Sequence, residues 1–210
     1  IVLMTSMIPG KEPLNPLKVY AGIWDGALGT SRRTWVTLRE AAILLCVALA
    51  VLPAFRMRFW NIGAEGQVLM GALGTAAVMI YGKGLPPWLL YTLMAVCGIL
   101  LGAVWGIIPS LFKAKWNTNE TLFTLMMNYI ALYFIKFFTE GPWRDPESSG
   151  FPKIALFEES ARLDKVLGVH CGWIIALLLV VFVFIYLKYT KSGYEISVVG
   201  ESHNTARYAG

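Results

Sequence analysis

The chain has 210 residues, of which 57% are hydrophobic and 15% are charged, and its formal net charge is +5. An average soluble protein is about 25% charged, so this composition excludes a soluble globular domain, and its aromatic content excludes a disordered chain. Three cysteines are too few for a disulfide scaffold. The sequence therefore predicts a multi-pass membrane protein, and basic residues flanking the spans explain the positive charge without a nucleic-acid partner.

The apolar run at residues 1–8 ends at Pro9 and Gly10. Crossing a bilayer takes about 20 residues, so this run predicts the end of a truncated span. A signal peptide is disfavoured because no basic n-region or cleavage site is visible. We expect a fragment of a larger protein, with residues 1–210 forming a single, incomplete transmembrane domain.

Five later stretches are apolar and long enough to cross a membrane as helices, and aromatic residues gather at their ends. They cover residues 34–55, 62–81, 88–112, 121–138 and 173–189. The predicted fold is all-α, a polytopic transmembrane helix bundle with five full spans plus the end of a truncated sixth at the N-terminus.

Two long connections, residues 10–33 and 141–172, lie on one side of the membrane if five spans are present, and residues 190–210 lie on the other. Lys and Arg are denser on the side of residues 190–210, which by the positive-inside rule favours a cytoplasmic location for them. We expect residues 141–172 to form an extracellular loop.

Three glycines, Gly98, Gly102 and Gly106, are spaced by four along the third predicted span. This spacing places them on one helical face, where they let two helix backbones approach closely. The pattern predicts a helix-packing surface and not a catalytic site.

Motifs that carry catalysis are missing from the sequence. It has no phosphate-binding loop, no zinc-protease motif and no nucleophile elbow. Its two histidines and three scattered cysteines predict no metal site. We therefore expect no catalytic residues and no enzyme activity in this chain.

The segment NIGAEGQ opens the second predicted span and contains Asn61, Glu65 and Gln67. One interpretation is structural: Asn61 is the N-cap, and Glu65 faces the positive end of the helix. The other is a helix end loosened by glycines that lines a hydrophilic pathway, as in transporters with broken helices. The two interpretations are compatible.

A second polar group introduces the fourth span and continues along one of its faces: Asn119, Glu120, Thr124 and Asn128. Polar side chains inside a span usually face the interior of the bundle. Interhelical hydrogen bonding and the lining of a solute path are both open interpretations.

The polar tail, residues 191–210, is a connecting loop by composition alone. Gly193 and Gly200 bracket a short segment, and either glycine permits a turn closed to residues with a Cβ. Residues 204–208 are compatible with a short amphipathic helix.

Three motifs, NIGAEGQ, NETLFTLMMNYIA and GYEISVVGESHNTARYAG, occur in this order and resemble permease subunits of bacterial ABC importers. The similarity covers nearly the whole chain and is greatest to the nucleoside branch, which works with basic-membrane-protein-type lipoproteins. The wider family includes permeases for ribose-type sugars and branched-chain amino acids.

The resemblance implies that residues 190–210 form a cytoplasmic loop that docks on an ATP-binding ABC subunit. It also implies a second related permease, a substrate-binding lipoprotein and a location in the bacterial cytoplasmic membrane. ATP would be used by the partner, so no cofactor is expected on this chain. The coupling positions implied by the family motif are Gly193, Tyr194, Glu195, Val199, Gly200, Asn204, Ala206, Arg207, Tyr208 and Gly210, while His203 stands where many members have a proline.

The expected function is thus a permease subunit that forms the pathway of a small polar solute, most simply a nucleoside, by alternating access. The alternatives are a simple sugar or a branched-chain amino acid as the solute. A different class is an ion-coupled secondary transporter, for which intramembrane acids are few. A membrane scaffold without transport leaves the polar faces of the spans unexplained.

Overall fold

The computed structural model describes residues 15–154, 161, 165–166, 169–202 and 206. The chain divides into two compact units, each described here by itself. One unit comprises residues 1–46 and 164–180, and the other comprises residues 47–163 and 181–210. The helices α3 and α7 contribute one part to each unit.

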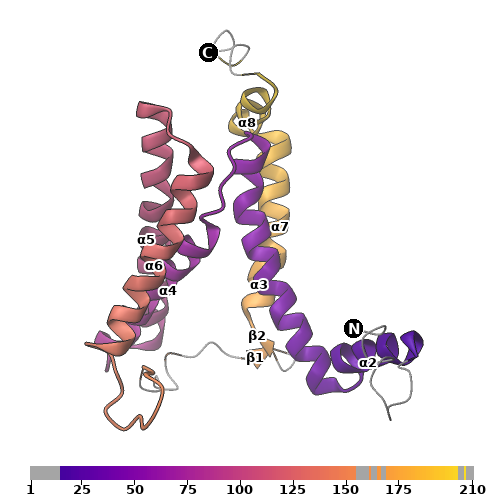
Figure 1. Ribbon diagram of the computed structural model, residues 1–210, viewed down its shortest axis with the longest axis vertical. Helices are drawn as coiled ribbons and strands as arrows, with labels where there is room; N and C mark the ends of the chain where they lie inside the picture. Colours follow the sequence, from indigo (N-terminus) through magenta and orange to yellow (C-terminus); the bar gives the residue numbers. More distant parts are fainter. Residues whose placement is uncertain (1–14, 155–160, 162–164, 167–168, 203–205, 207–210) are drawn as a thin grey trace, which may run out of the picture. The chain divides into compact units, whose positions relative to one another are not determined.

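The first unit contains α2 (Pro16–Leu28), the first part of α3 (Ser31–Arg56) and the first part of α7 (Gly172–Tyr189). Two short strands, β1 (Lys165–Val166) and β2 (Val169–His170), pair antiparallel with Lys165 opposite His170 (Figure 1).

Helix α2 lies within the stretch 10–33 that we expect from the sequence to be a connection. Its start follows from local chemistry, since the Asn15 side chain accepts a hydrogen bond from the backbone N–H of Leu17 and Pro16 occupies the first turn.

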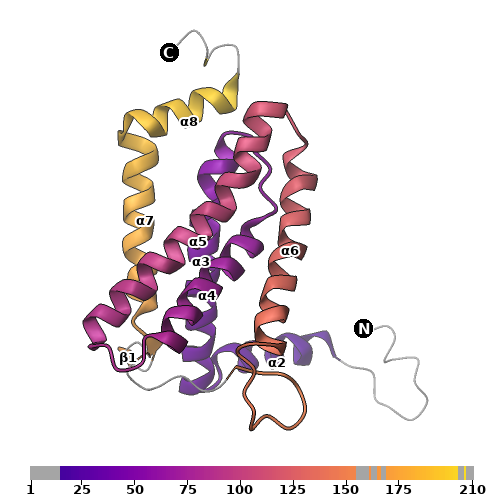
Figure 2. The ribbon, with the colours of Figure 1, turned by 90° about the vertical axis from the view of Figure 1, so that its left-hand side faces the viewer.

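The second unit is built on α4 (Ala64–Tyr81), α5 (Pro87–Trp116) and α6 (Glu120–Glu140), which lie side by side (Figure 2). It also contains the end of α3, the end of α7 and α8 (Lys191–Glu201). A hydrophobic core of Met70, Leu73, Ala131 and Trp143 joins α4 to α6 and to the segment after α6. Trp105 of α5 packs against this core, so the three helices form one packed group.

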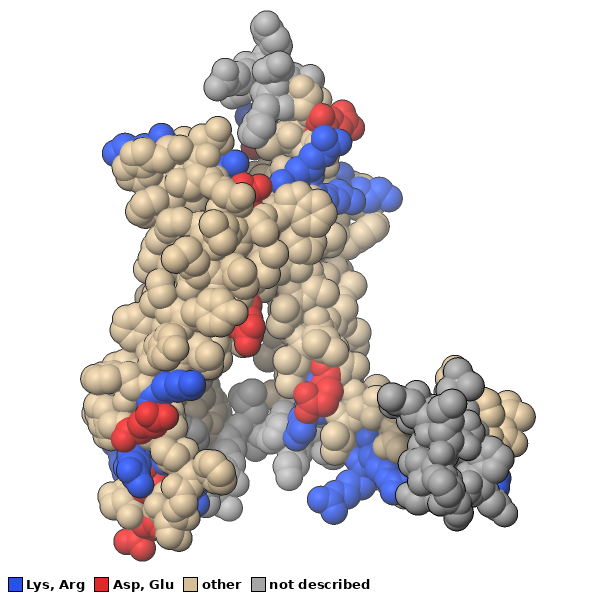
Figure 3. Space-filling model, in the orientation of Figure 1, with Lys and Arg blue, Asp and Glu red and all other residues tan. Residues whose placement is uncertain are grey.

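Among the described residues, four helices are long and apolar enough to cross a membrane: α3, α5, α6 and α7. They correspond to four of the five predicted spans, so a multi-pass helical membrane protein is confirmed. On the face shown in Figure 3, uncharged residues cover most of the helix surfaces, and charged residues concentrate toward the helix ends. The truncated sixth span predicted at the N-terminus lies outside the described residues.

The predicted span 62–81 corresponds to α4, which is not among these four helices. Its first turns carry Glu65 and Gln67, and glycines replace larger apolar residues along it. It is also the helix with four buried residues, Gly66, Met70, Leu73 and Gly74, because it packs against both α5 and α6. A helix that is enclosed by other helices exposes less surface to lipid, so it needs fewer apolar residues than a helix that faces lipid. The composition of α4 is therefore compatible with a span, and the count of five spans remains a prediction.

The glycines Gly98, Gly102 and Gly106 of α5 face α4. A Cβ added to Gly98 would lie 2.8 Å from Thr75 Oγ1, and one on Gly102 would lie 3.3 Å from the carbonyl oxygen of Gln67. A Cβ on Gly106 would lie 2.7 Å from Gln67 Nε2. The two helices therefore approach too closely here for larger side chains.

Replacing Gly102 with Leu should separate α4 from α5, because the new side chain meets the backbone of Gln67 rather than a flexible side chain. We expect a loss of about 1–3 kcal/mol in the free energy of unfolding, measured by denaturation of the purified protein in detergent. The matched control is Gly22→Leu in α2, where a Cβ meets nothing within 4 Å. Equal stability of the two variants would contradict close packing at Gly102.

Candidate solute pathway and docking helix

The turn before α4 is built around Asn61, which is 9% exposed. Its Oδ1 accepts a hydrogen bond of 2.9 Å from the backbone N–H of Gly63, so the side chain closes a turn over two residues. One interpretation of the sequence makes Asn61 the N-cap of this helix, and the structure corrects it. The cap residue is Gly63, which has no side chain to bond a backbone N–H, and Asn61 instead closes the turn before it.

Two side chains of α6 hold the start of α4. The hydroxyl of Thr124, which is fully buried, accepts a hydrogen bond of 3.2 Å from the N–H of Ile62. The Asn128 amide bonds at both ends: its Oδ1 accepts from the N–H of Gly66 at 2.8 Å, and its Nδ2 donates to the Ile62 carbonyl at 2.9 Å. Thr124 and Asn128 thus make the interhelical hydrogen bonds that are one of the two interpretations of this face.

Gly63 and Gly66 make these bonds possible. A Cβ on Gly63 would lie 2.9 Å from the Thr124 Cβ, and a Cβ on Gly66 would lie 2.8 Å from Asn128 Oδ1. Helix α4 can reach α6 at this point only because both positions lack a side chain. The glycines of NIGAEGQ therefore seat the helix end on its neighbour.

Asn119 and Glu120 stabilise the turn between α5 and α6. Asn119 is the N-cap of α6, and its Oδ1 accepts a hydrogen bond of 3.1 Å from the N–H of Leu122. Glu120 forms an ion pair of 2.9 Å with Lys113, in the last turn of α5. The charge of Glu120 is thus balanced by a basic residue that the sequence alone does not assign to it.

Gln67 and Glu65 lie apart from this hydrogen-bonded contact. A groove of about 260 Å³ runs between the end of α3, α4 and α5, with walls that include Val47, Ala50 and Ile99. Of the described residues that line it, only Gln67 has a polar side chain. Glu65 is exposed, and no hydrogen bond or ion pair of its carboxylate is found within the described part of the chain.

Helix α8 contains both tail glycines, and both are buried. The turn that either glycine permits does not form, because residues 191–201 are continuously helical. A Cβ on Gly193 would overlap the carbonyl oxygens of Tyr186 and Leu187 at the end of α7, and a Cβ on Gly200 would overlap the carbonyl oxygen of Arg56. The glycines therefore let α8 lie directly on the ends of α7 and α3.

The other predicted coupling residues are placed only in part. Tyr194 is 65% exposed, and Glu195 pairs with Lys191 at 3.6 Å. Val199 is half-buried, and the N–H of Ala206 donates to the carbonyl of Ser202 at 3.0 Å. Asn204, Arg207, Tyr208 and Gly210 lie outside the described residues.

Within the residues that the structure describes, no group of three or more His, Cys, Asp or Glu side chains is arranged to hold a metal ion. Asn119, Thr124 and Asn128 bond to backbone groups at the starts of α4 and α6, whereas Gln67 lines the groove and Tyr194 of α8 is exposed.

Residues 35–210 match a protein family described as the permease component of the branched-chain amino acid transport system. The guanosine ABC transporter permease protein NupP of Bacillus subtilis is 31% identical over 91% of this chain. The glucose ABC transporter permease protein TsgB13 of Haloferax volcanii is 30% identical over 94%, and the nucleoside ABC transporter permease protein NupB of Lactococcus lactis is 28% identical over 93%. The chain spans about half the length of these relatives, between 55% and 57%. No solved structure matches it.

Proposed function

The chain belongs to this family of transport-system permease components, and on that premise we propose that it is a permease subunit of an ATP-driven importer. The observation that carries the proposal is the match over residues 35–210 in a chain whose described part includes four apolar helices long enough to cross a membrane. The proposed location is the bacterial cytoplasmic membrane. Residues 141–172 would face outside and residues 190–210 the cytoplasm.

The proposed solute is a nucleoside. Two of the similar permeases are described as guanosine and nucleoside transporters, which supports this choice over the sugar of the third. The groove beside Gln67 also suits such a molecule, since its walls are apolar and its one polar lining group is a neutral amide. Apolar walls with few polar groups are typical of small-molecule sites. A simple sugar or a branched-chain amino acid remains the alternative.

We assign the solute path to Gln67 and Glu65, whose side chains are not used to join α4 to α6. Asn61, Thr124 and Asn128 bond to the backbone around the start of α4, and Asn119 and Glu120 stabilise the α5–α6 turn. The first three residues would shape the path by positioning α4, and Asn119 and Glu120 would do so by positioning α6, rather than by touching the solute.

The proposed partners are an ATP-binding subunit, a second related permease, a substrate-binding lipoprotein and the surrounding membrane lipid. The ATP-binding subunit would dock on α8, where Tyr194 is exposed and Tyr and Arg are the residue types that dominate interfaces. ATP would bind and be hydrolysed in that partner. The movement of α8 would then expose the solute path to one side of the membrane and next to the other.

Competition for uptake tests the proposal. In cells that carry the complete system, unlabelled nucleosides should compete with labelled nucleoside, whereas nucleotides should not, because the path has no basic cluster for a phosphate. Gln67→Ala should weaken apparent affinity by about tenfold, the effect of losing one or two hydrogen bonds. Ser110→Ala, which removes a hydroxyl bonded only within α5, is the control. Competition by sugars or by branched-chain amino acids alone would replace the nucleoside assignment.

A further inference from the structure

Helix α2 carries a stripe of large apolar side chains that the packing of its unit does not cover. Leu17, Tyr20, Trp24 and Leu28 are spaced by three, four and four residues, which places them along one face of the helix. Leu17 is 76% exposed, and Tyr20 and Trp24 are each 70% exposed. We name these four residues the α2 stripe. Large apolar side chains arranged in this way indicate an interaction surface.

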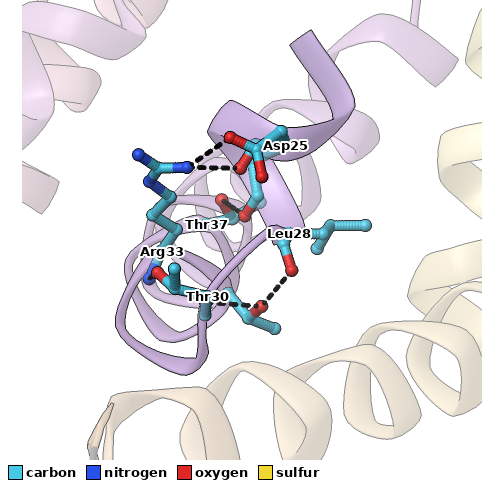
Figure 4. Close-up of polar contacts among 7 residues, drawn as sticks. Asp25, Leu28, Thr30, Arg33 and Thr37 are labelled. Atoms are coloured by element: carbon cyan, nitrogen blue, oxygen red, sulfur yellow. Dashed lines mark hydrogen bonds and ion pairs between the residues drawn. The ribbon is translucent and has the colours of Figure 1, made fainter. Parts of the chain in front are cut away.

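A polar face of α2 that adjoins the stripe carries Lys18, Gly22 and Asp25, at roughly 90–160° around the helix axis from the stripe centre. Asp25 also holds the corner between α2 and α3: Arg33 Nη1 donates to Asp25 Oδ2 at 2.6 Å and to the Asp25 carbonyl at 3.0 Å (Figure 4). The polar face thus joins α2 to α3 and leaves the stripe free.

Two threonines of α3 complete the corner. The hydroxyl of Thr37 donates to the Ala27 carbonyl at 2.9 Å, and that of Thr34 donates to the Leu28 carbonyl at 3.3 Å (Figure 4). The last carbonyls of a helix have no partner within the helix, so these bonds satisfy groups that otherwise need water. Arg33 adds a positive charge at the negative end of α2. The corner therefore holds α2 across the start of α3 in a defined orientation.

We propose that α2 is an interfacial helix, and that the α2 stripe is buried at the boundary between the lipid headgroups and the acyl chains of the bilayer. Only Gly29 and Thr30 separate α2 from α3, which is long and apolar enough to span the membrane. Trp35, one turn into α3, is of the type that gathers at membrane interfaces. This short link keeps α2 at the membrane surface, where a Leu, Tyr and Trp face matches the composition of interfacial helices.

The corner and the stripe together would set the position of α3 in the membrane. A helix whose end is attached to a surface-bound helix cannot slide along the membrane normal without pulling that helix out of the interface. Tilt and depth of a span are set by such interfacial anchors and by neighbouring helices. The proposal depends on the membrane location of α3 and not on the solute or on the ATP-binding partner.

Spin labels on single cysteines test the proposal. The three native cysteines are replaced by alanine, and labels are placed on the protein in liposomes at Leu17, Tyr20 or Trp24 on the stripe and at Lys18 or Gly22 on the polar face. All five positions are exposed, so the labels need not disturb packing. Because the stripe should lie about 5–10 Å into the boundary region, its ratio of oxygen to nickel-chelate accessibility should exceed that of the polar face by on the order of threefold.

A variant of the corner provides an independent readout. Arg33→Gln should reduce the contrast between the two faces, because α2 then loses its fixed orientation, whereas Arg32→Gln, which changes a neighbouring arginine, should preserve it. Equal nickel-chelate accessibility at all five positions would show that α2 lies in water and would overturn the proposal. Protection of the stripe from both reagents would do the same, because it would show that protein and not lipid covers this face.

Discussion

Gly200→Val should remove most ATP-driven uptake while leaving the membrane insertion of the chain intact. The new side chain would overlap the carbonyl oxygen of Arg56, so α8 must move away from the end of α3. Overpacking of this kind typically costs about 1–3 kcal/mol, a shift of about fivefold to 150-fold between two states. We expect uptake to fall by at least about fivefold and less ATP-binding subunit to co-purify. Uptake of labelled nucleoside and quantification of the partner in the purified complex measure both effects.

Two variants separate this contact from a general effect on α8. Ser197→Ala removes a hydroxyl that bonds only to the Gly193 carbonyl within the same helix, and its uptake should be normal. Gly193→Val should resemble Gly200→Val, because a side chain there meets the end of α7. Wild-type uptake by correctly inserted Gly200→Val would mean that α8 is a passive connection and has no part in coupling.

Asn128→Leu should give a large loss of stability. The substitution keeps the volume of the side chain but leaves the N–H of Gly66 and the carbonyl of Ile62 without their partner. The substitution removes two hydrogen bonds, one part-buried and one exposed. Each contributes about 0.5–1.5 kcal/mol in a typical protein, and interhelical hydrogen bonds in membranes average about 0.6 kcal/mol. We therefore expect a loss of about 1–3 kcal/mol, or several degrees in the midpoint of thermal unfolding, measured in detergent by near-ultraviolet circular dichroism.

The same measurement on other variants tests the origin of that loss. Thr124→Val removes the acceptor for the Ile62 N–H and should destabilise in the same direction. Combined with Asn128→Leu it should be less than additive, because both side chains hold the same segment. Ser110→Ala is the control, since its hydroxyl bonds to the Gly106 carbonyl one turn away. An unchanged midpoint for Asn128→Leu would show that α4 does not depend on α6 for its position.

The long helices could be predicted from the sequence because their boundaries depend on local signals. Residues 121–138 were predicted to span the membrane, and α6 covers Glu120–Glu140 with Asn119 as its cap. Helix α5 extends to Trp116, beyond the predicted end at residue 112, because two lysines continue it until Asn117 adopts the left-handed conformation. Apolar length and capping residues were sufficient for these elements.

Other features depend on contacts between distant residues and could not be read from local pattern. Asn128 meets Ile62 and Gly66, which lie more than 60 residues earlier in the chain. Whether its amide faces a solute or a helix end is decided only by the position of α4. The sequence does not predict a helix at Gly193 and Gly200, because glycine in a polar segment suggests a turn. In the structure these two glycines instead allow α8 to pack closely against the main chain of α7 and α3. For α2, the pair Asn15–Pro16 was an available signal.

The contact at Gly200 joins two stretches of main chain directly, without a side chain between them. A side chain at such a junction can change rotamer and absorb a small displacement, but main-chain atoms in contact within two helix ends have no equivalent freedom. The residues after Arg56 lead within a few positions to Asn61 and the start of α4. A push on α8 would therefore reach residues 57–63, which join α3 to the start of α4 and so to the wall of the groove. The first step of this route is a contact between main-chain atoms, so it would not wait for a side chain to change its rotamer.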